Sequence, residues 1–221
     1  MTIQPWGALF DWDGVIIDSS RHHEKSWALL AAEENLPLPP NAFWLGFGRK
    51  NQIIIPEIYK WSTDPAEIER LGARKEALYR ELMAAEALEP LPGVRAWLQA
   101  LRDAGVPCAV GSSTPRANLD AVMGRIGLTE FFKAIVSAED VTLGKPHPEV
   151  FLTAAARIGC APERCVVFED ALAGIAAAHA GGMRAVAVAT THPLEKLTHA
   201  DLAIRTMEEL SVEKIGQWFT A

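Results

Sequence analysis

Features that would point to a nucleic acid or a membrane are scarce in this sequence. Lys and Arg number 21 against 28 Asp and Glu, which gives a formal net charge of −7, and the basic residues form no cluster. Because binding to a phosphate backbone needs a basic face, we expect no nucleic acid as the main partner. No apolar run approaches the length of a bilayer span, so we expect no membrane partner either.

Cysteine is also rare. Cys108, Cys160 and Cys165 form neither a disulfide framework nor a CxxC metal pair, and we interpret them as buried, reduced thiols. Residues 1–6 lack the basic and apolar regions of a secretory signal. These features predict a cytoplasmic protein, and nothing in the sequence demands more than a monomer.

Short runs rich in Val, Ile and Ala occur near the start of the chain and repeatedly after position 105. They lie at 7–12, 106–113, 133–140, 164–170 and 184–190, with a last strand around 202–204. Continuously apolar strands suit a parallel sheet that is covered on both faces. Segments with helical spacing alternate with them, at 115–126, 147–158, 171–180 and 207–219. This alternation predicts an α/β fold with a doubly wound parallel sheet.

Residues 18–91 have a different pattern. They are amphipathic, helical in spacing and without a convincing strand, and the run "PLPG" at 90–93 marks their end. A chain of 221 residues can form one core and a small accessory domain. We therefore predict a sheet domain from residues 1–17 and 92–221, with an all-helical domain at 18–91 inserted into it.

Polar side chains follow several of the predicted strands. Asp11 and Asp13 follow the first, Ser112 ends the second, and Glu169 and Asp170 end the fourth; Lys145 comes shortly after the third. In an open parallel sheet, ligands bind beyond the carboxyl ends of the strands. Acids that converge there repel one another unless a cation lies between them, and Mg²⁺ prefers oxygen ligands. The acids are therefore our candidate Mg²⁺ ligands, with Glu169 binding directly or through water. Ser112 and Lys145 are suited to hold the oxygens of a phosphoryl group.

Four motifs carry a resemblance to a known family. "DWDG", Ser112, Lys145 in "GKPHP" and "FED" at 168–170 resemble, in order and spacing, the motifs of the haloacid dehalogenase-like (HAD) superfamily. A lone DxDG is common, but four motifs in order at strand ends are specific. The resemblance spans essentially the whole chain and implies a Rossmann-like core with a helical cap. It is closest to the β-phosphoglucomutase-like phosphatases and mutases, through "DGVIIDSSRHHEKSW", "GFGRKN", "GKPHPEVF" and "FEDALAGIAAAHAGGM". The stretch "GRKNQIIIPEIYKWSTDPAEIERL" also resembles plant phosphatases that act on flavin-pathway phosphates.

The resemblance implies a role for each core residue. Asp11 is the nucleophile, because a carboxylate is ionised at neutral pH and can attack phosphorus. Asp13 is the general acid and base, and Ser112 and Lys145 stabilise the transferring phosphoryl group. The neighbouring Ser113 and Thr114 are expected to be turn or helix-capping residues.

The predicted cap is expected to choose the substrate. Arg49 and Lys75 match positions where mutases of this group contact the far end of a sugar phosphate, and His23 matches a histidine of the first cap helix. With Gly46 of "GFGR" they are our candidate substrate-binding residues, set against an alternative as surface or core residues. The aromatic side chains of Trp44, Phe47 and Trp61 are expected to serve core packing more than a pocket.

These observations predict a Mg²⁺-dependent phosphatase that hydrolyses a small phosphomonoester, such as a sugar phosphate, through an aspartyl-phosphate. The alternative is a sugar phosphomutase of the β-phosphoglucomutase type. A phosphonate hydrolase ranks third, because it needs a Schiff-base lysine in the cap. Lys50 is near the relevant loop, but Arg49 occupies the motif position. A binding module that lost its activity is disfavoured, since no motif acid is missing.

Overall fold

The computed structural model describes residues 5–220 and contains a six-stranded sheet in the order β3-β2-β1-β4-β5-β6. All neighbouring strands run parallel. The predicted doubly wound α/β fold is confirmed. Residues 1–4 and 221 of the predicted sheet domain lie outside the described residues. The strands are β1 (Gly7–Phe10), β2 (Cys108–Gly111), β3 (Ala134–Val136), β4 (Cys165–Glu169), β5 (Arg184–Val188) and β6 (Leu202–Ile204).

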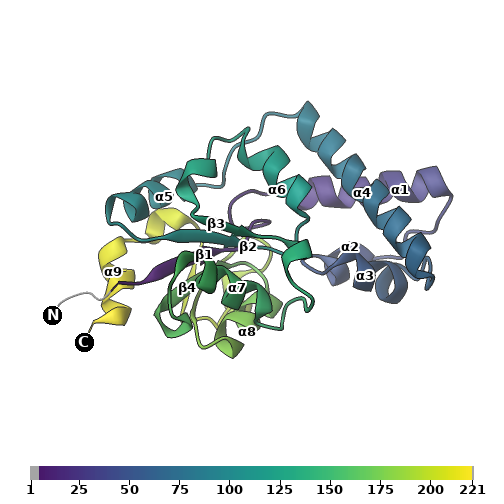
Figure 1. Cartoon of the computed structure of the whole chain (residues 1–221). Helices are drawn as coiled ribbons and strands as arrows, with labels where there is room; N and C mark the ends of the chain where they lie inside the picture. Colours follow the sequence, from purple (N-terminus) through teal and green to yellow (C-terminus); the bar gives the residue numbers. More distant parts are fainter. Residues whose placement is uncertain (1–4, 221) are drawn as a thin grey trace.

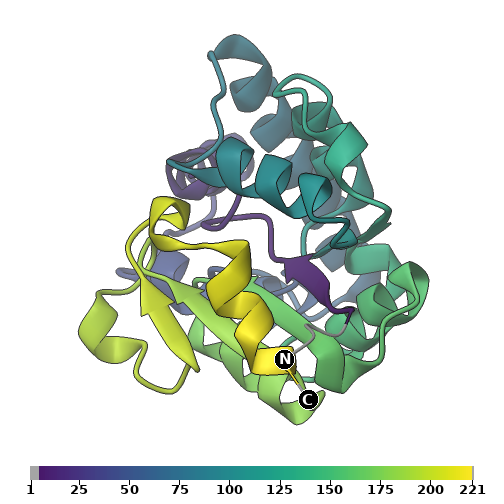
Figure 2. The ribbon, with the colours of Figure 1, turned by 90° about the vertical axis from the view of Figure 1, so that its left-hand side faces the viewer.

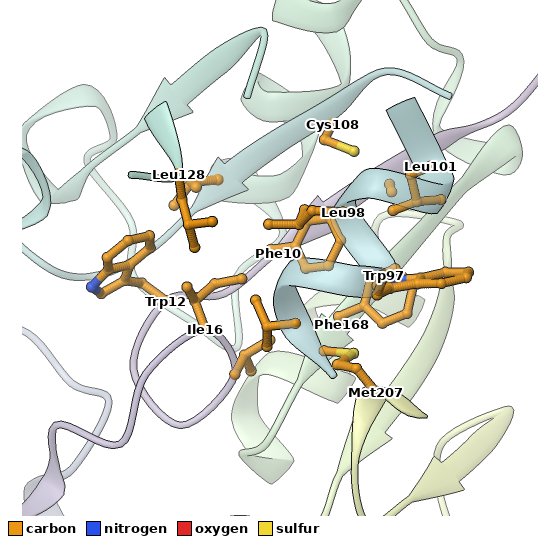
Figure 3. Close-up of a cluster of buried hydrophobic side chains, with 14 of the residues drawn as sticks. Phe10, Trp12, Ile16, Trp97, Leu98, Leu101, Cys108, Leu128, Phe168 and Met207 are labelled. Atoms are coloured by element: carbon orange, nitrogen blue, oxygen red, sulfur yellow. The ribbon is translucent and has the colours of Figure 1, made fainter. Parts of the chain in front are cut away.

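Helices cover both faces of the sheet. Figure 1 shows α5 (Val94–Asp103) and α6 (Arg116–Met123) above it, and α7 (Glu149–Ile158) and α8 (Leu172–Ala180) below it. Successive side chains of a strand point to opposite faces. Phe10 of β1 accordingly joins the cluster on the α5 side, whereas Leu9 joins the cluster on the α7 side. In the first cluster the rings of Phe10 and Phe168 stack at 4.6 Å beside Trp97 of α5 (Figure 3).

Several predicted elements are shorter or more broken than expected. The run 133–140 forms a strand only over Ala134–Val136, because Ser137 then caps the 3-10 turn η3 (Ala138–Asp140). The predicted helix at 207–219 is three pieces: η6 (Met207–Glu209), α9 (Val212–Gly216) and η7 (Gln217–Phe219). The chain starts a new helix at α9 because the Ser211 hydroxyl accepts the Lys214 N–H. Helix α5 had not been predicted. The remaining 3-10 turns are η2 (Thr129–Phe131), η4 (Pro162–Arg164) and η5 (Leu194–Lys196).

Between β1 and α5 the chain forms helices and no named strand. These are α1 (Ser20–Glu34), α2 (Ala42–Gly46), α3 (Asn51–Ile53), the π-helix η1 (Ile54–Tyr59) and α4 (Pro65–Ala85). We call residues 20–85 the cap and the rest of the described chain the core; the boundaries 18 and 91 stay a prediction. The cap has its own apolar cluster, which includes Trp27, Leu30 and Leu71. It lies to the right in Figure 1.

The two ends of the described chain meet on the side away from the cap. Trp6 stacks on Phe219 with ring centroids 5.8 Å apart, and Figure 2 looks onto this side. None of the helices within residues 5–220 combines the length and the apolar character needed to cross a membrane.

Candidate active site

A cavity of about 920 Å³ lies where the cap meets the carboxyl ends of β1, β2 and β4. The direction in which the chain adds strands to the sheet reverses at β1, since β2 and β4 flank β1 on opposite sides. Such a switch point is where open α/β sheets bind ligands. The cavity is lined by both parts of the molecule: the core contributes strand-end residues such as Asp11 and Ser112, and the cap contributes α1, α4 and the segment around α2.

Three buried carboxylates converge at the floor of this cavity. Asp11, Glu169 and Asp170 each offer an oxygen, and these oxygens all lie within 4.8 Å of one another. The backbone N–H of Asp11 donates to the carbonyl of Phe168 at 2.9 Å, which ties the end of β1 to β4. Gly14 turns beneath the acids at φ +79°, where an added Cβ would lie 1.9 Å from Asp170 Oδ2. The sheet therefore brings Asp11 and Asp170 together, as predicted from their places at strand ends.

Within the part of the chain that the structure describes, one ammonium group pairs with these acids. Lys145 Nζ lies 3.0 Å from Asp11 Oδ1 and 2.6 Å from Glu169 Oε1. Burial, reinforced by Glu169 and Asp13 and opposed by Lys145, raises the pKa of Asp11 to about 7. Burial and the charges of Glu169 and Asp11 likewise raise the pKa of Asp170 well above its ordinary value. When all three carboxylates are ionised they carry more negative charge than Lys145 balances, and this all-oxygen donor set fits a hard divalent cation.

The Glu169 carboxylate accepts more hydrogen bonds than Asp11 or Asp170. Its Oε1 accepts from Lys145, and its Oε2 accepts the backbone N–H groups of Asp170 at 2.8 Å and Ala171 at 2.7 Å. Asp170 accepts a hydrogen bond from the Thr191 hydroxyl. Binding of a metal by Glu169, directly or through water, stays a prediction, and these contacts also let Glu169 hold Lys145 in place.

Asp13 faces different partners. The hydroxyls of Ser19 and Thr114 donate to its two oxygens, and His23 Nε2 lies 3.4 Å from its Oδ1. Burial alone would raise the pKa of Asp13, but these partners, His23 above all, lower it to about 2. The structure does not bring the Asp13 side chain into the group of three acids, because the hydroxyls hold it elsewhere. The prediction that Asp13 is a metal ligand therefore finds no support in the side-chain geometry.

Ser112 is buried at the end of β2 and lines the cavity, where its hydroxyl accepts the Thr114 N–H at 3.2 Å. Thr114 lies in the bend between β2 and α6, as expected of a turn residue, but it does not cap α6, which begins after Pro115 with no side-chain cap. Its hydroxyl instead donates to Asp13.

The candidate residues of the cap all line the same cavity, but they face different parts of it. Arg49 is exposed, and within residues 5–220 its guanidinium makes no hydrogen bond or ion pair. Gly46 is buried at the end of α2, where an added Cβ would lie 3.2 Å from Ile54. His23 and Lys75 are buried against each other, with Lys75 Nζ 2.7 Å from His23 Nδ1. His23 and Lys75 therefore form a support behind Asp13.

The aromatic residues Trp44, Phe47 and Trp61 also differ in their surroundings. Trp61 packs on Tyr59 with centroids 4.6 Å apart and donates to the Pro37 carbonyl, as expected for cap packing. Phe47 and Trp44 line the cavity, and Trp44 contacts Phe43 and Phe47 but stays 55% exposed, so it is not a core residue.

The chain can now be compared with known proteins. The family model described as haloacid dehalogenase-like hydrolase matches residues 7–182. The chain belongs to the haloacid dehalogenase-like hydrolases. The resemblance found in the sequence is confirmed, and so is the prediction of a hydrolytic enzyme of this family.

Relatives and solved structures agree with this assignment. The chain is 40% identical over 209 residues to the chloroplastic 5-amino-6-(5-phospho-D-ribitylamino)uracil phosphatase of Arabidopsis thaliana; the match covers 93% of this chain but only 56% of that protein. It is 32% identical to the β-phosphoglucomutase of Bacillus subtilis, over 95% of this chain and 93% of that protein. The β-phosphoglucomutase structure from Clostridium difficile superposes with a TM-score of 0.86 at 25% identity, covering 98% and 97% of the two chains.

In this HAD-like hydrolase, sequence reasoning missed several residues that shape the site. Besides Thr114 and Ser19, they include Lys50, whose ammonium donates to the core carbonyls of Ala138 at 2.9 Å and Val141 at 2.7 Å. Because Lys50 is committed to the core, its contacts do not favour the phosphonate hydrolase alternative. Thr114 had a signal, since it follows Ser112 at a strand end. Lys50 had none, because its partners lie 88 and 91 residues away.

Proposed function

We propose that this HAD-like hydrolase is a Mg²⁺-dependent phosphatase that hydrolyses a small phosphorylated metabolite. One observation carries the proposal: Asp11, at the end of the central strand, lies in a buried group of three carboxylates at a cavity shared by cap and core. Asp11, Glu169 and Asp170 are the residues that would hold Mg²⁺. When bound, the ion would neutralise their repulsion and allow an anionic phosphate to approach.

The residues of the chain divide the chemistry between them. The Asp11 carboxylate attacks phosphorus and forms an aspartyl-phosphate as the bond to the leaving oxygen breaks. Asp13 gives a proton to that oxygen and then takes one from the water that attacks the aspartyl-phosphate, which releases inorganic phosphate and restores Asp11. Lys145 and Ser112 hold the phosphoryl oxygens.

Asp13 must change its proton affinity during this cycle. Its lowered pKa makes it an ionised base when the cavity holds no phosphate. A phosphate dianion bound nearby disfavours that charge and raises the pKa, which prepares Asp13 for the acid step. The hydroxyls of Ser19 and Thr114 can stay in contact with either form.

The relatives support a small phosphorylated metabolite as the substrate class. One is named for a phosphoribitylamino-uracil phosphatase and another for a glucose phosphate mutase. On the cap side, Arg49 and Trp44 are free to contact the part of the substrate beyond the phosphate. A cytoplasmic location and a monomeric state stay predictions.

A panel of small phosphomonoesters, scored by kcat/KM for phosphate release, tests this proposal. Asp11→Asn keeps the shape of the side chain but removes the nucleophile. We expect phosphate release to fall by about a thousandfold or more, with the circular dichroism spectrum unchanged. Unchanged turnover in this variant would remove Asp11 from the nucleophile role.

The second candidate is a sugar phosphomutase, supported by the Bacillus subtilis relative and by Arg49, which lines the cavity and has no side-chain partner among residues 5–220. In a mutase the phosphoryl group passes to a second hydroxyl of the sugar in place of water. Conversion of β-glucose 1-phosphate to glucose 6-phosphate, measured against phosphate release from the same sample, separates the two. Phosphate as the main product supports the phosphatase.

A further inference from the structure

A buried carboxylate of the cap, Glu76 on α4, reaches across to the core. Its Oε2 accepts a hydrogen bond of 2.6 Å from Nδ2 of Asn118 on α6. Asn118 is only 1% exposed, and its Oδ1 accepts a second hydrogen bond of 2.8 Å from Arg80. Residues four apart share one face of a helix, so Glu76 and Arg80 hold the same amide from one side of α4. The Asn118 side chain thus links α6 to the cap through two hydrogen bonds.

The other oxygen of Glu76 leads toward the candidate active site. Glu76 Oε1 accepts from Lys75 Nζ at 3.0 Å, and Lys75 Nζ lies 2.7 Å from His23 Nδ1. His23 Nε2 in turn lies 3.4 Å from Asp13 Oδ1. A continuous polar chain therefore leaves the core at Asn118, crosses the cap and returns to the core at Asp13.

Glu76 supplies the negative charge that the buried Lys75 ammonium needs in this chain of contacts. The side chains of Lys75 and Glu76 are 4% and 9% exposed, so each needs the other as a counter-charge. Asn51 Nδ2 donates a further bond of 2.9 Å to Glu76 Oε1. The ring of His23 stacks on Tyr79 at 4.1 Å, which leaves the imidazole a fixed plane and makes Lys75 its polar partner at Nδ1. Displacing Glu76 would free Lys75 to move away from His23.

We propose that Glu76 is a positioning residue that couples the seating of the cap on α6, through Asn118, to the placement of Lys75 and His23 behind Asp13. This inference rests on the proposed function, because it assigns Asp13 the proton transfer. It predicts that loss of the contact between the cap and α6 lowers the rate of the chemical step and does not only weaken substrate binding.

The test compares Glu76→Gln, Asn118→Ala and the double variant with wild type, using p-nitrophenyl phosphate and Mg²⁺. Glu81→Gln is the matched control: it makes the same chemical change on the same helix, at an exposed carboxylate that pairs with Arg74. The small probe has few atoms with which to contact the cap, so its KM reports cap contacts weakly and its kcat reports the chemistry. Thermal unfolding of each variant confirms folding, and Asn118→Ala carries the test if Glu76→Gln does not fold.

We expect Glu76→Gln to lower kcat by about 10- to 100-fold, as for the loss of a charged hydrogen-bond partner, with KM changed less than about threefold. Glu81→Gln should stay within about twofold of wild type. Because Glu76 and Asn118 belong to one chain, the double variant should be no slower than Glu76→Gln. Equal kcat values for Glu76→Gln and Glu81→Gln, or fully additive losses in the double variant, would overturn the proposal.

Hydrogen exchange gives a readout that needs no turnover. Amides of α6 and of the first turns of α1 should exchange faster in Glu76→Gln than in wild type or Glu81→Gln. If wild type releases no phosphate but this difference is found, the proposed function fails and the coupling survives. If exchange is unchanged in both segments, the coupling itself is wrong.

Discussion

At the scale of single residues, the partners of two neighbouring carboxylates shift their pKa values in opposite directions. Asp11 and Asp13 are two positions apart and both buried, yet the pKa of Asp11 is raised to about 7 and that of Asp13 is lowered to about 2. Asp11 faces two further acids and one lysine, whereas Asp13 faces hydroxyls and a histidine. Environments that push paired acids apart in pKa are typical of sites that divide catalytic roles.

The sequence allowed the positions of these acids to be predicted, but not all of their contacts. Asp11, Glu169 and Asp170 could be placed together because the ends of parallel strands share an edge. The Thr114 contact with Asp13 could not, because it depends on how the chain turns after β2. A hydroxyl at a strand end can either cap the following helix or donate to a side chain of the site, and the residue pattern is the same in both cases.

Gly174, in the first turn of α8, has no room for a larger residue. A Cβ at Gly174 would lie 1.8 Å from Glu169 Oε1, so Gly174→Ala forces Glu169 away from Lys145. We expect phosphatase kcat/KM to fall by about tenfold or more and the free energy of unfolding by about 1–3 kcal/mol. Urea unfolding and phosphate release measure the two effects.

Gly124 provides the control for this substitution. A Cβ there would meet only the Asp120 carbonyl, at an ordinary 3.7 Å. Gly124→Ala should therefore leave activity unchanged and the free energy of unfolding within about 1 kcal/mol of wild type. Equal losses of activity in the two alanine variants would show that Gly174 has no special role.

At the scale of elements, the pattern of apolar residues predicted which segments form strands, while their lengths depended on the polar residues that follow. Helix α5 was missed although its buried residues Val94, Trp97, Leu98 and Leu101 have helical spacing. The predicted helix at 207–219 was wrong as one element because Ser211 starts a new helix inside it. Capping by a single serine is easily overlooked in an otherwise helical pattern.

The junction between β3 and α7 predicts a dependence of stability on pH. Asp140 accepts from the Ser137 N–H at 2.8 Å and pairs with Arg157 of α7. The hydrogen bond from Arg157, above all, lowers the pKa of Asp140 from 3.8 to about 2. The charged form therefore stabilises the folded state above about pH 4, and this contribution is lost as the pH falls toward 2.

Asp140→Asn should consequently lower the free energy of unfolding at pH 7 by about 1 kcal/mol, a value reduced for partial exposure. The amide still offers an acceptor to Ser137. Urea unfolding of both proteins at a series of pH values should show the difference narrowing below pH 4. A difference that stays constant down to the acid limit of folding would contradict this explanation.

At the scale of the whole molecule, the cap and the core are joined by buried polar contacts between residues far apart in sequence. Lys50 bonds to carbonyls 88 and 91 positions away, and Glu76 bonds to Asn118, 42 positions away. Periodicity predicted a helical insertion, but periodicity says nothing about which of its charged side chains turn toward the core. The organisation into two parts was therefore predictable, and the contacts that link them were not.

The excess of negative charge in the core predicts that Mg²⁺ stabilises the whole chain. A cation present at 100 times its Kd stabilises a protein by about 2.7 kcal/mol, which for a chain of this size raises Tm by roughly 5–10 °C. We expect this shift in wild type and a much smaller one in Asp170→Asn. Equal shifts in both proteins would mean that Mg²⁺ acts elsewhere.

Direct detection of phosphate on Asp11 tests the central claim. Protein is mixed with a ³²P-labelled phosphomonoester selected from the substrate panel and with Mg²⁺, quenched in acid within one turnover, digested and analysed by mass spectrometry. Asp13→Asn is included because it should slow hydrolysis of the intermediate and so increase its amount. We predict label on the peptide that contains Asp11, in wild type and more strongly in Asp13→Asn, and none in Asp11→Asn. Phosphate release without label on this peptide, or with equal label in Asp11→Asn, would contradict the account.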